Sequence, residues 1–162
     1  MNEGRGPSLQ ERFAPQGRCF GCGPANEHGL RISTRPSADQ PGTVATVWHA
    51  GREHEAFAGV VNGGICGTLL DCTMNWAAVG HLVGAGTSDV APDTVTAQLS
   101  IEFLAPTPSD RPIVVRGRVV RSDGHRVLVE GSIEVDGVAS ATARGTFVTV
   151  GRDHPAFGRW RG

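Results

Sequence analysis

The sequence predicts one α+β domain in which a single long helix lies against an antiparallel sheet. After the adjacent glycines Gly63 and Gly64, apolar residues recur at three- and four-residue spacing, which is the pattern of a helix with one buried face. Beyond residue 93, four segments alternate apolar and polar side chains as strands do, and Asp-Gly pairs separate the last three. Because one helix cannot cover both faces of such a sheet, the sheet should lie on one side of the helix and wrap around it.

The start of the chain is polar and rich in glycine and proline, and residues 1–17 are predicted to form a mobile leader. Cys19 and Cys22 then form a CxxC pair. One CxxC without a second ligand pair is a weak zinc signal, and His28 and His54 are further candidates by residue type alone. We interpret the pair as a structural turn, and we expect neither a metal nor a cofactor.

The elements that follow are predicted from their periodicity. Strands are expected over 30–34 and 43–50, and a loop over 51–61 leads to the glycine pair. The helix should run from Gly63 to about Leu82 and end in a glycine-rich linker over 84–88.

The strand over 94–104 alternates cleanly, and its apolar row from Val95 to Phe103 should face the helix. Three further strands are expected as antiparallel neighbours over 113–121, 125–135 and 138–150. The domain should therefore span 18–150 and be followed by a C-terminal tail over 151–162.

Length and charge exclude several classes of function. A chain of 162 residues is long enough to bury a hydrophobic core. Its net charge of −1 gives no sign of the positively charged surface that would bind nucleic acid or a membrane. No apolar stretch resembles a signal peptide or a membrane span. With four cysteines and no secretory signal, we expect free thiols and a cytoplasmic location.

Asp71 is the residue of the predicted helix that requires an explanation. It lies in the apolar stripe beside Leu70 and Cys72, where burying a carboxylate is costly. It either turns to solvent or to an arginine, or it takes part in chemistry. The unpaired N–H groups of Gly63 and Gly64 would be open to a ligand carbonyl, as in an oxyanion hole, although the same glycines equally suit a tight turn.

Three segments together resemble PaaI-type hot-dog thioesterases. They are the opening from Cys19 to Ile32, the loop and helix from His54 to Asp71, and the strand end from Ile101 to Pro106. The resemblance implies a hot-dog fold, in which a long central helix is wrapped by an antiparallel sheet, and a homodimer or a dimer of dimers. It also implies hydrolysis of acyl-coenzyme A thioesters without a metal or a bound cofactor.

The resemblance also assigns roles to individual residues. Asp71 would attack the thioester carbonyl or activate a water molecule, Gly63 or Gly64 would donate an N–H group to the carbonyl oxygen, and Thr96 would orient water. The family commonly has His where this chain has Asn62, which cannot titrate near neutral pH. Another family position, an Asn, falls here on Ala56.

Further residues of the same region are candidate substrate contacts: His54, Phe57 and Asn75. Asn75, one turn beyond Asp71, is also the candidate partner that keeps the carboxylate charged. Thr96 belongs to the polar row of its strand, so a bulge or a dimer edge would be needed to bring it to the helix.

The predicted chemistry requires two subunits. A helix rises about 1.5 Å per residue, so Gly64 and Asp71 lie about 10 Å apart along one axis, too far to serve one thioester. Asp71 should therefore meet the glycines of a second copy. Two alternatives stay open: a protein that binds acyl-CoA without turnover, and a dehydratase, whose usual His-plus-acid pairing is not evident here.

Overall fold

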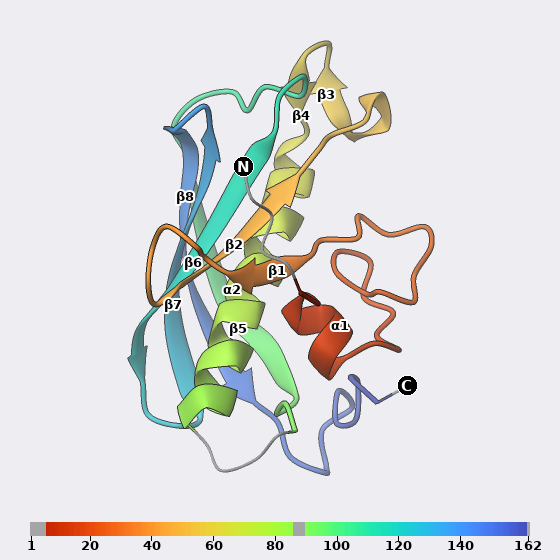
Figure 1. Ribbon diagram of the computed structural model, residues 1–162, viewed down its shortest axis with the longest axis vertical. Coiled ribbons are helices and arrows are strands. Elements are labelled where there is room, and N and C mark those ends of the chain that lie inside the picture. Colours follow the sequence, from red (N-terminus) through yellow and green to blue (C-terminus); the bar gives the residue numbers. More distant parts are fainter. Residues whose placement is uncertain (1–5, 86–89, 162) are drawn as a thin grey trace.

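The computed structural model describes residues 6–85 and 90–161 (Figure 1). Two helices and a six-stranded antiparallel sheet make up most of it, and a short 3-10 turn (Arg52–His54) and a two-stranded hairpin precede the second helix. In chain order the elements are α1 (Leu9–Phe13), β1 (Thr34–Pro36), β2 (Thr43–Trp48), β3 (Glu55–Phe57), β4 (Val60–Val61), α2 (Gly63–Ala85), β5 (Thr94–Phe103), β6 (Ile113–Ser122), β7 (Arg126–Val135) and β8 (Val138–Thr149).

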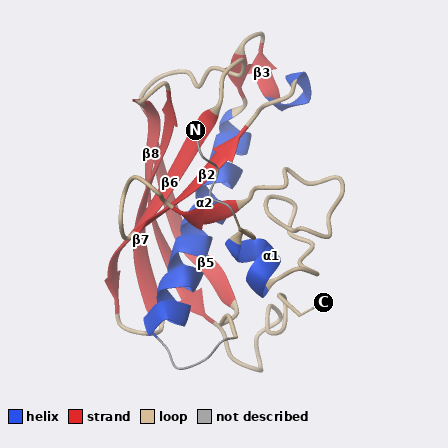
Figure 2. Ribbon diagram, viewed as in Figure 1, coloured by secondary structure: helices blue, strands red, loops and turns tan. Residues whose placement is uncertain are grey.

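The main sheet has the order β1-β2-β6-β7-β8-β5, and all its neighbours are antiparallel. The hairpins β6–β7 and β7–β8 are the ones that the Asp-Gly pairs predict. β5 does not pair with β6, as the chain order suggested, but with β8, and it forms one edge of the sheet. The predicted fold class, a long helix wrapped by an antiparallel sheet, is confirmed, and Figures 1 and 2 show the sheet along one side of α2.

Glycines on the inner face of the sheet let α2 approach closely. A Cβ atom on Gly131 of β7 would lie 2.7 Å from the sulfur of Met74, and one on Gly117 of β6 would lie 3.2 Å from the Cβ atom of Ala77. Met74 is completely buried. A larger residue at either strand position would push the helix outward and open voids in a core that must be close-packed.

A third layer covers the other side of α2, where α1, the loop after it and the C-terminal segment lie in Figure 1. A buried chain of hydrogen bonds ties this layer to the helix: the Gln10 amide donates to Thr34, whose hydroxyl lies 3.0 Å from that of Thr46, which in turn lies 3.0 Å from that of Thr73. Every member has a partner, so these polar groups can be buried without an unpaired donor.

The predicted leader over 1–17 is structured from residue 6 onward, while residues 1–5 lie outside the described residues. The Ser8 side-chain oxygen accepts a hydrogen bond from the Glu11 N–H group, and the Ser8 backbone N–H donates to the Glu11 carboxylate in return, a capping box that starts α1. The predicted tail over 151–162 is described as far as residue 161, and this part also packs: Trp160 is buried, its ring centroid lies 5.1 Å from that of Trp76, and its indole N–H donates to the Pro92 carbonyl.

Several element bounds differ from the predictions. The first strand covers 34–36 instead of 30–34, and the loop predicted over 51–61 contains the 3-10 turn and the β3–β4 hairpin. α2 continues three residues beyond Leu82, to Ala85; of the linker predicted over 84–88, residues 86–88 lie outside the described part of the chain. Neither helix in the described ranges combines the length and the apolar character needed to cross a membrane.

Candidate active site

Asp71 lies in the middle of α2, and Thr96 of β5 is its hydrogen-bond partner. The Thr96 hydroxyl donates to Asp71 Oδ1 at 2.6 Å. The carboxyl group is half-buried, and this burial raises its pKa above the usual range; the hydrogen bond from Thr96 works against that rise. Two more distant groups contribute less: the charge on Cys19 raises the pKa, and Arg159 lowers it. The carboxylate is thus a partly desolvated base with one directed donor.

A β-bulge explains how Thr96 reaches the helix. The register of β5 against β8 shifts between Thr96 and Gln98, so Ala97 is an extra residue. Before the bulge the polar row faces α2, because Thr94 bonds to the helix as Thr96 does. After it the apolar row faces the helix, and the Ile101 side chain would lie 3.5 Å from a Cβ atom on Gly67. The expectation that the apolar row faces the helix throughout is therefore wrong for the first part of β5.

The start of α2 is capped by Asn62. Its side-chain oxygen accepts hydrogen bonds from the N–H groups of Gly64 at 2.8 Å and Ile65 at 3.3 Å, so Asn62 acts as the N-cap residue. Because both partners are donors, the oxygen must face the helix and the amide NH₂ group must point away from it. The Gly64 N–H is therefore occupied within the chain.

Gly63 is the first residue of α2 and is exposed. Among the hydrogen bonds of the described residues, its N–H group has no acceptor, as expected in the first turn of a helix. A Cβ atom here would lie 3.5 Å from the ring of Phe103, whose side chain is 54% exposed. A free N–H donor thus sits beside an exposed aromatic ring. Phe103 was not predicted as a site residue; it lies in the apolar row of β5, but the sequence gives no signal of its contact with Gly63.

Three candidate substrate contacts have different surroundings. His54 packs on Trp48 with ring centroids 4.9 Å apart, its Nδ1 accepts from the Gly51 N–H, and its carbonyl accepts from the Asn62 N–H. Its role in the described structure is to hold the turn before the helix. Phe57 is 64% exposed on β3 and is open to a ligand or a second chain.

Among the hydrogen bonds of the described residues, none joins Asn75 to Asp71. It is buried, and its side-chain oxygen accepts a hydrogen bond from the Thr94 hydroxyl at 2.8 Å. The partner of Asp71 is Thr96 instead, so the expectation that Asn75 keeps the carboxylate charged is wrong.

Residues with metal-binding side chains gather at one further place. Cys72, which follows Asp71 on α2, lies against the CxxC pair of Cys19 and Cys22. The sequence contains no signal that connects Cys72 to the CxxC pair, because the contact depends on how the N-terminal loop packs on the helix.

Comparisons with known proteins agree on one family. A family model described as the thioesterase superfamily matches residues 58–142. The chain is similar to the crystal structure of a thioesterase superfamily protein, with a TM-score of 0.63 and 26% identity over 85% of this chain. It spans only 63% of the length of that protein. No curated protein matches the chain.

Two further solved structures are similar to the chain. One is a phenylacetic acid degradation-related protein from Ralstonia eutropha JMP134, with a TM-score of 0.61, 26% identity, and coverage of 74% of this chain and 86% of that one. The other is a hypothetical thioesterase from Streptococcus pneumoniae TIGR4, solved with coenzyme A; its TM-score is 0.59 and its identity 19%, over 74% of this chain and 87% of that one.

Proposed function

The chain belongs to the thioesterase superfamily, and we propose that it hydrolyses acyl-coenzyme A thioesters with Asp71 as nucleophile or general base. The observation that supports this role most directly is the 2.6 Å hydrogen bond from Thr96 to the half-buried Asp71 carboxylate. Burial makes the carboxylate a stronger base, and the threonine hydroxyl stabilises its ionised form and fixes its orientation.

As a general base, Asp71 takes a proton from a water molecule while the water oxygen bonds to the thioester carbonyl carbon. The carbonyl oxygen becomes an oxyanion and accepts a hydrogen bond from the Gly63 N–H group. When the carbon–sulfur bond breaks, the proton passes to the coenzyme A sulfur, which leaves as the thiol beside a carboxylic acid. As a nucleophile, Asp71 would instead bond to the acyl carbon and form an anhydride, while the carbon–sulfur bond breaks and coenzyme A leaves as the thiolate. Water then hydrolyses the anhydride, which releases the carboxylic acid, regenerates the Asp71 carboxylate and supplies the proton for the thiolate.

The two groups must come from different copies of the chain. Gly63 and Asp71 belong to one continuous helix, and eight residues at about 1.5 Å each separate them by about 12 Å along its axis. A base or nucleophile has to lie within about 3.5 Å of the reacting atoms. We therefore place Asp71 of one subunit beside Gly63 of a second, with two equivalent sites in a twofold-symmetric dimer.

The edge strand β5 supports this assembly. It is ten residues long and pairs only with β8 among the described strands, so its other edge offers a row of backbone donors and acceptors. The apolar side chains of Phe103 and Leu104 are 54% and 52% exposed at its end. Two copies joined edge to edge at β5 would extend the sheet and cover these side chains.

Coenzyme A as the carrier is supported by the similar structure from Streptococcus pneumoniae TIGR4, which was solved with that ligand. Three arginines of β6 and β8 that could reach phosphates are already paired in this chain: Arg116 with Asp39 and Glu134, and Arg118 and Arg144 both with Glu130. Phosphate recognition would have to use other cations or break these pairs.

The proposed function is tested with a panel of short, long and aromatic acyl-CoAs, by following thiol release from the wild-type chain and from Asp71→Asn. A positioned general base contributes about 10²–10⁴ in rate, so the variant should lose at least about a hundredfold in kcat/KM. The matched control is Asp153→Asn, which makes the same change at an exposed carboxylate of the C-terminal segment, away from β5, and should leave turnover unchanged. Full activity of Asp71→Asn would contradict the proposal.

One observation favours a second candidate, an acyl-CoA-binding protein without turnover. The Asn62 side chain accepts a hydrogen bond from the Gly64 N–H group, so the N-terminus of α2 offers a substrate fewer free backbone donors than two adjacent glycines could supply. Calorimetric titration with the same panel separates the two functions. If the wild-type chain binds acyl-CoA without releasing thiol, it is a binding protein and not a hydrolase.

A further inference from the structure

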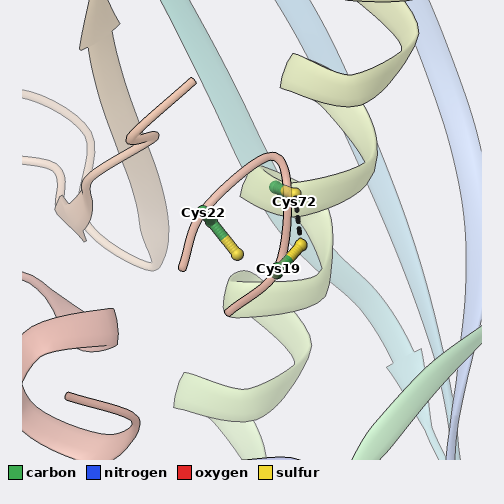
Figure 3. A group of neighbouring side chains, drawn as sticks. All are labelled: Cys19, Cys22 and Cys72. Atoms are coloured by element: carbon green, nitrogen blue, oxygen red, sulfur yellow. Dashed lines mark hydrogen bonds between the residues drawn. The ribbon is translucent and has the colours of Figure 1, made fainter. Parts of the chain in front are cut away.

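Three cysteine side chains converge between the N-terminal loop and α2 (Figure 3). Cys19 and Cys22 come from the loop and Cys72 from the helix, and their sulfur atoms all lie within 4.8 Å of one another. The sulfurs of Cys19 and Cys72 are 3.9 Å apart. All three are free thiols, and two of them, Cys22 and Cys72, are buried.

We propose that Cys19, Cys22 and Cys72 together bind one zinc ion. Zinc binds thiolates at about 2.3 Å in a tetrahedral arrangement, which places two sulfur ligands about 3.8 Å apart. The Cys19–Cys72 distance is already 3.9 Å, and the two distances to the Cys22 sulfur, each at most 4.8 Å, need to shorten by about 1 Å or less. A water molecule completes the four ligands.

The groups around the sulfurs suit thiolate ligands. The indole N–H of Trp76 donates to the Cys22 sulfur at 3.3 Å. N–H donors of this kind orient metal-bound sulfur and stabilise its negative charge.

The loop is shaped to bring its sulfurs to the helix. A Cβ atom on Gly21 would lie 2.4 Å from the Cys72 sulfur, and one on Gly23 would lie 2.5 Å from the Cys19 backbone nitrogen. Glycine at both positions therefore permits the close turn. The bound ion would fix the N-terminal loop to α2 at the residue next to Asp71.

Cys66 provides a matched control on the same helix. It is also a buried free cysteine, but its sulfur contacts the Thr107 hydroxyl at 3.7 Å and it is not part of the cluster. Replacing it by serine removes one thiol from the chain without removing a proposed ligand.

The experiment measures zinc in the full-length protein purified under reducing conditions, by elemental analysis, and then titrates the chelator-treated protein with Co²⁺. We expect one zinc ion per chain and sulfur-to-cobalt charge-transfer absorption that saturates at one equivalent. Cys22→Ser and Cys72→Ser should weaken binding by more than about tenfold, since even an outer partner of a ligand is worth about 10–100-fold. Cys66→Ser should bind as the wild-type chain does.

A readout on the wild-type chain keeps the test valid if a cysteine variant fails to fold. Zn²⁺ added to the chelator-treated protein should raise its midpoint of thermal unfolding, because a ligand of the native state stabilises it, and Mg²⁺ should not. The proposal would be overturned by zinc well below one per chain with no cobalt–sulfur absorption. A disulfide within the cluster in the reduced wild-type protein, seen as a loss of two hydrogens in the intact mass, would overturn it as well.

Discussion

The hydrogen bond between Thr96 and Asp71 balances two opposing demands on one carboxylate. A base in a thioesterase must be ionised, and burial of Asp71 opposes ionisation by raising its pKa. The Thr96 hydroxyl favours the ionised form without adding a charge. The working pH of the site should therefore depend on this one donor.

Thr96→Val tests that dependence. The change removes the donor, so the pKa of Asp71 should rise further, and because only the ionised form is active, the acidic limb of the kcat/KM profile should move to higher pH. Activity is then lost at pH values where the wild-type chain still works. The measurement is the pH profile of thiol release. Thr96→Ser, which keeps a hydroxyl, should restore the wild-type limb.

A neighbouring hydroxyl provides the control for that profile. Thr94→Val alters the same strand but removes a hydrogen bond to Asn75 instead of one to Asp71. If the limb moved equally in Thr94→Val, or did not move in Thr96→Val, the pairing of Thr96 with Asp71 would have no bearing on catalysis.

Single residues were predictable where type and position together restrict their role. Asp71 was identified because burying a carboxylate in the apolar stripe of a helix costs free energy. The glycine pair was identified because it stands at the start of that helix. Their partners were not predictable. Thr96 replaces the expected Asn75 because Asn75 bonds to Thr94, and Cys72 meets Cys19 across 53 residues of chain. Such contacts depend on the packing of layers, which no local pattern encodes.

At the scale of elements, the start of α2 sets the number of backbone donors available to a substrate. Asn62 caps the helix and engages the N–H groups of Gly64 and Ile65, which leaves Gly63 as the exposed donor of the first turn. The first helical position has a useful property: proline is tolerated there, because the N–H group has no partner within the helix.

Gly63→Pro should therefore delete the donor and keep the helix. We expect kcat to fall by about 10²–10³, the usual effect of removing one oxyanion-hole donor, with no loss of thermal stability. Gly63→Ala retains the N–H group, and its Cβ atom would make ordinary contact with Phe103 at 3.5 Å, so it should retain most of the activity. If kcat fell equally in the two variants, the cause would be steric crowding at the N-terminus of α2 and not the loss of the N–H donor.

The long elements followed from periodicity, whereas short or irregular ones did not. α2 and the three C-terminal strands match their predicted ranges to within a few residues. α1 has five residues, too few for a periodic pattern, although the Ser8–Glu11 capping box was a readable signal. A bulge was expected only as one of two ways to bring Thr96 to the helix, and its position at Ala97 was not predictable, because alternating residues on β5 give no mark of where the alternation reverses.

At the scale of the whole molecule, the site assigned to this chain is incomplete in one copy. The helix that carries the proposed base also carries the proposed donor about 12 Å away, and the edge strand beside Asp71 has an unpaired side among the described strands. On the proposed mechanism, a single subunit would offer half of each of two sites. The catalytic unit should therefore be a dimer whose sites are formed between subunits.

Subunit complementation tests this claim most directly. Asp71→Asn and Gly63→Pro chains, each nearly inactive alone, are unfolded together, refolded as a mixture and assayed for thiol release. A mixed dimer has one site with both wild-type groups, and random pairing makes half the dimers mixed, so the mixture should regain about a quarter of the wild-type activity. If the mixture, with mixed dimers verified by native mass spectrometry, is no more active than its parents, the base and the donor do not meet across subunits.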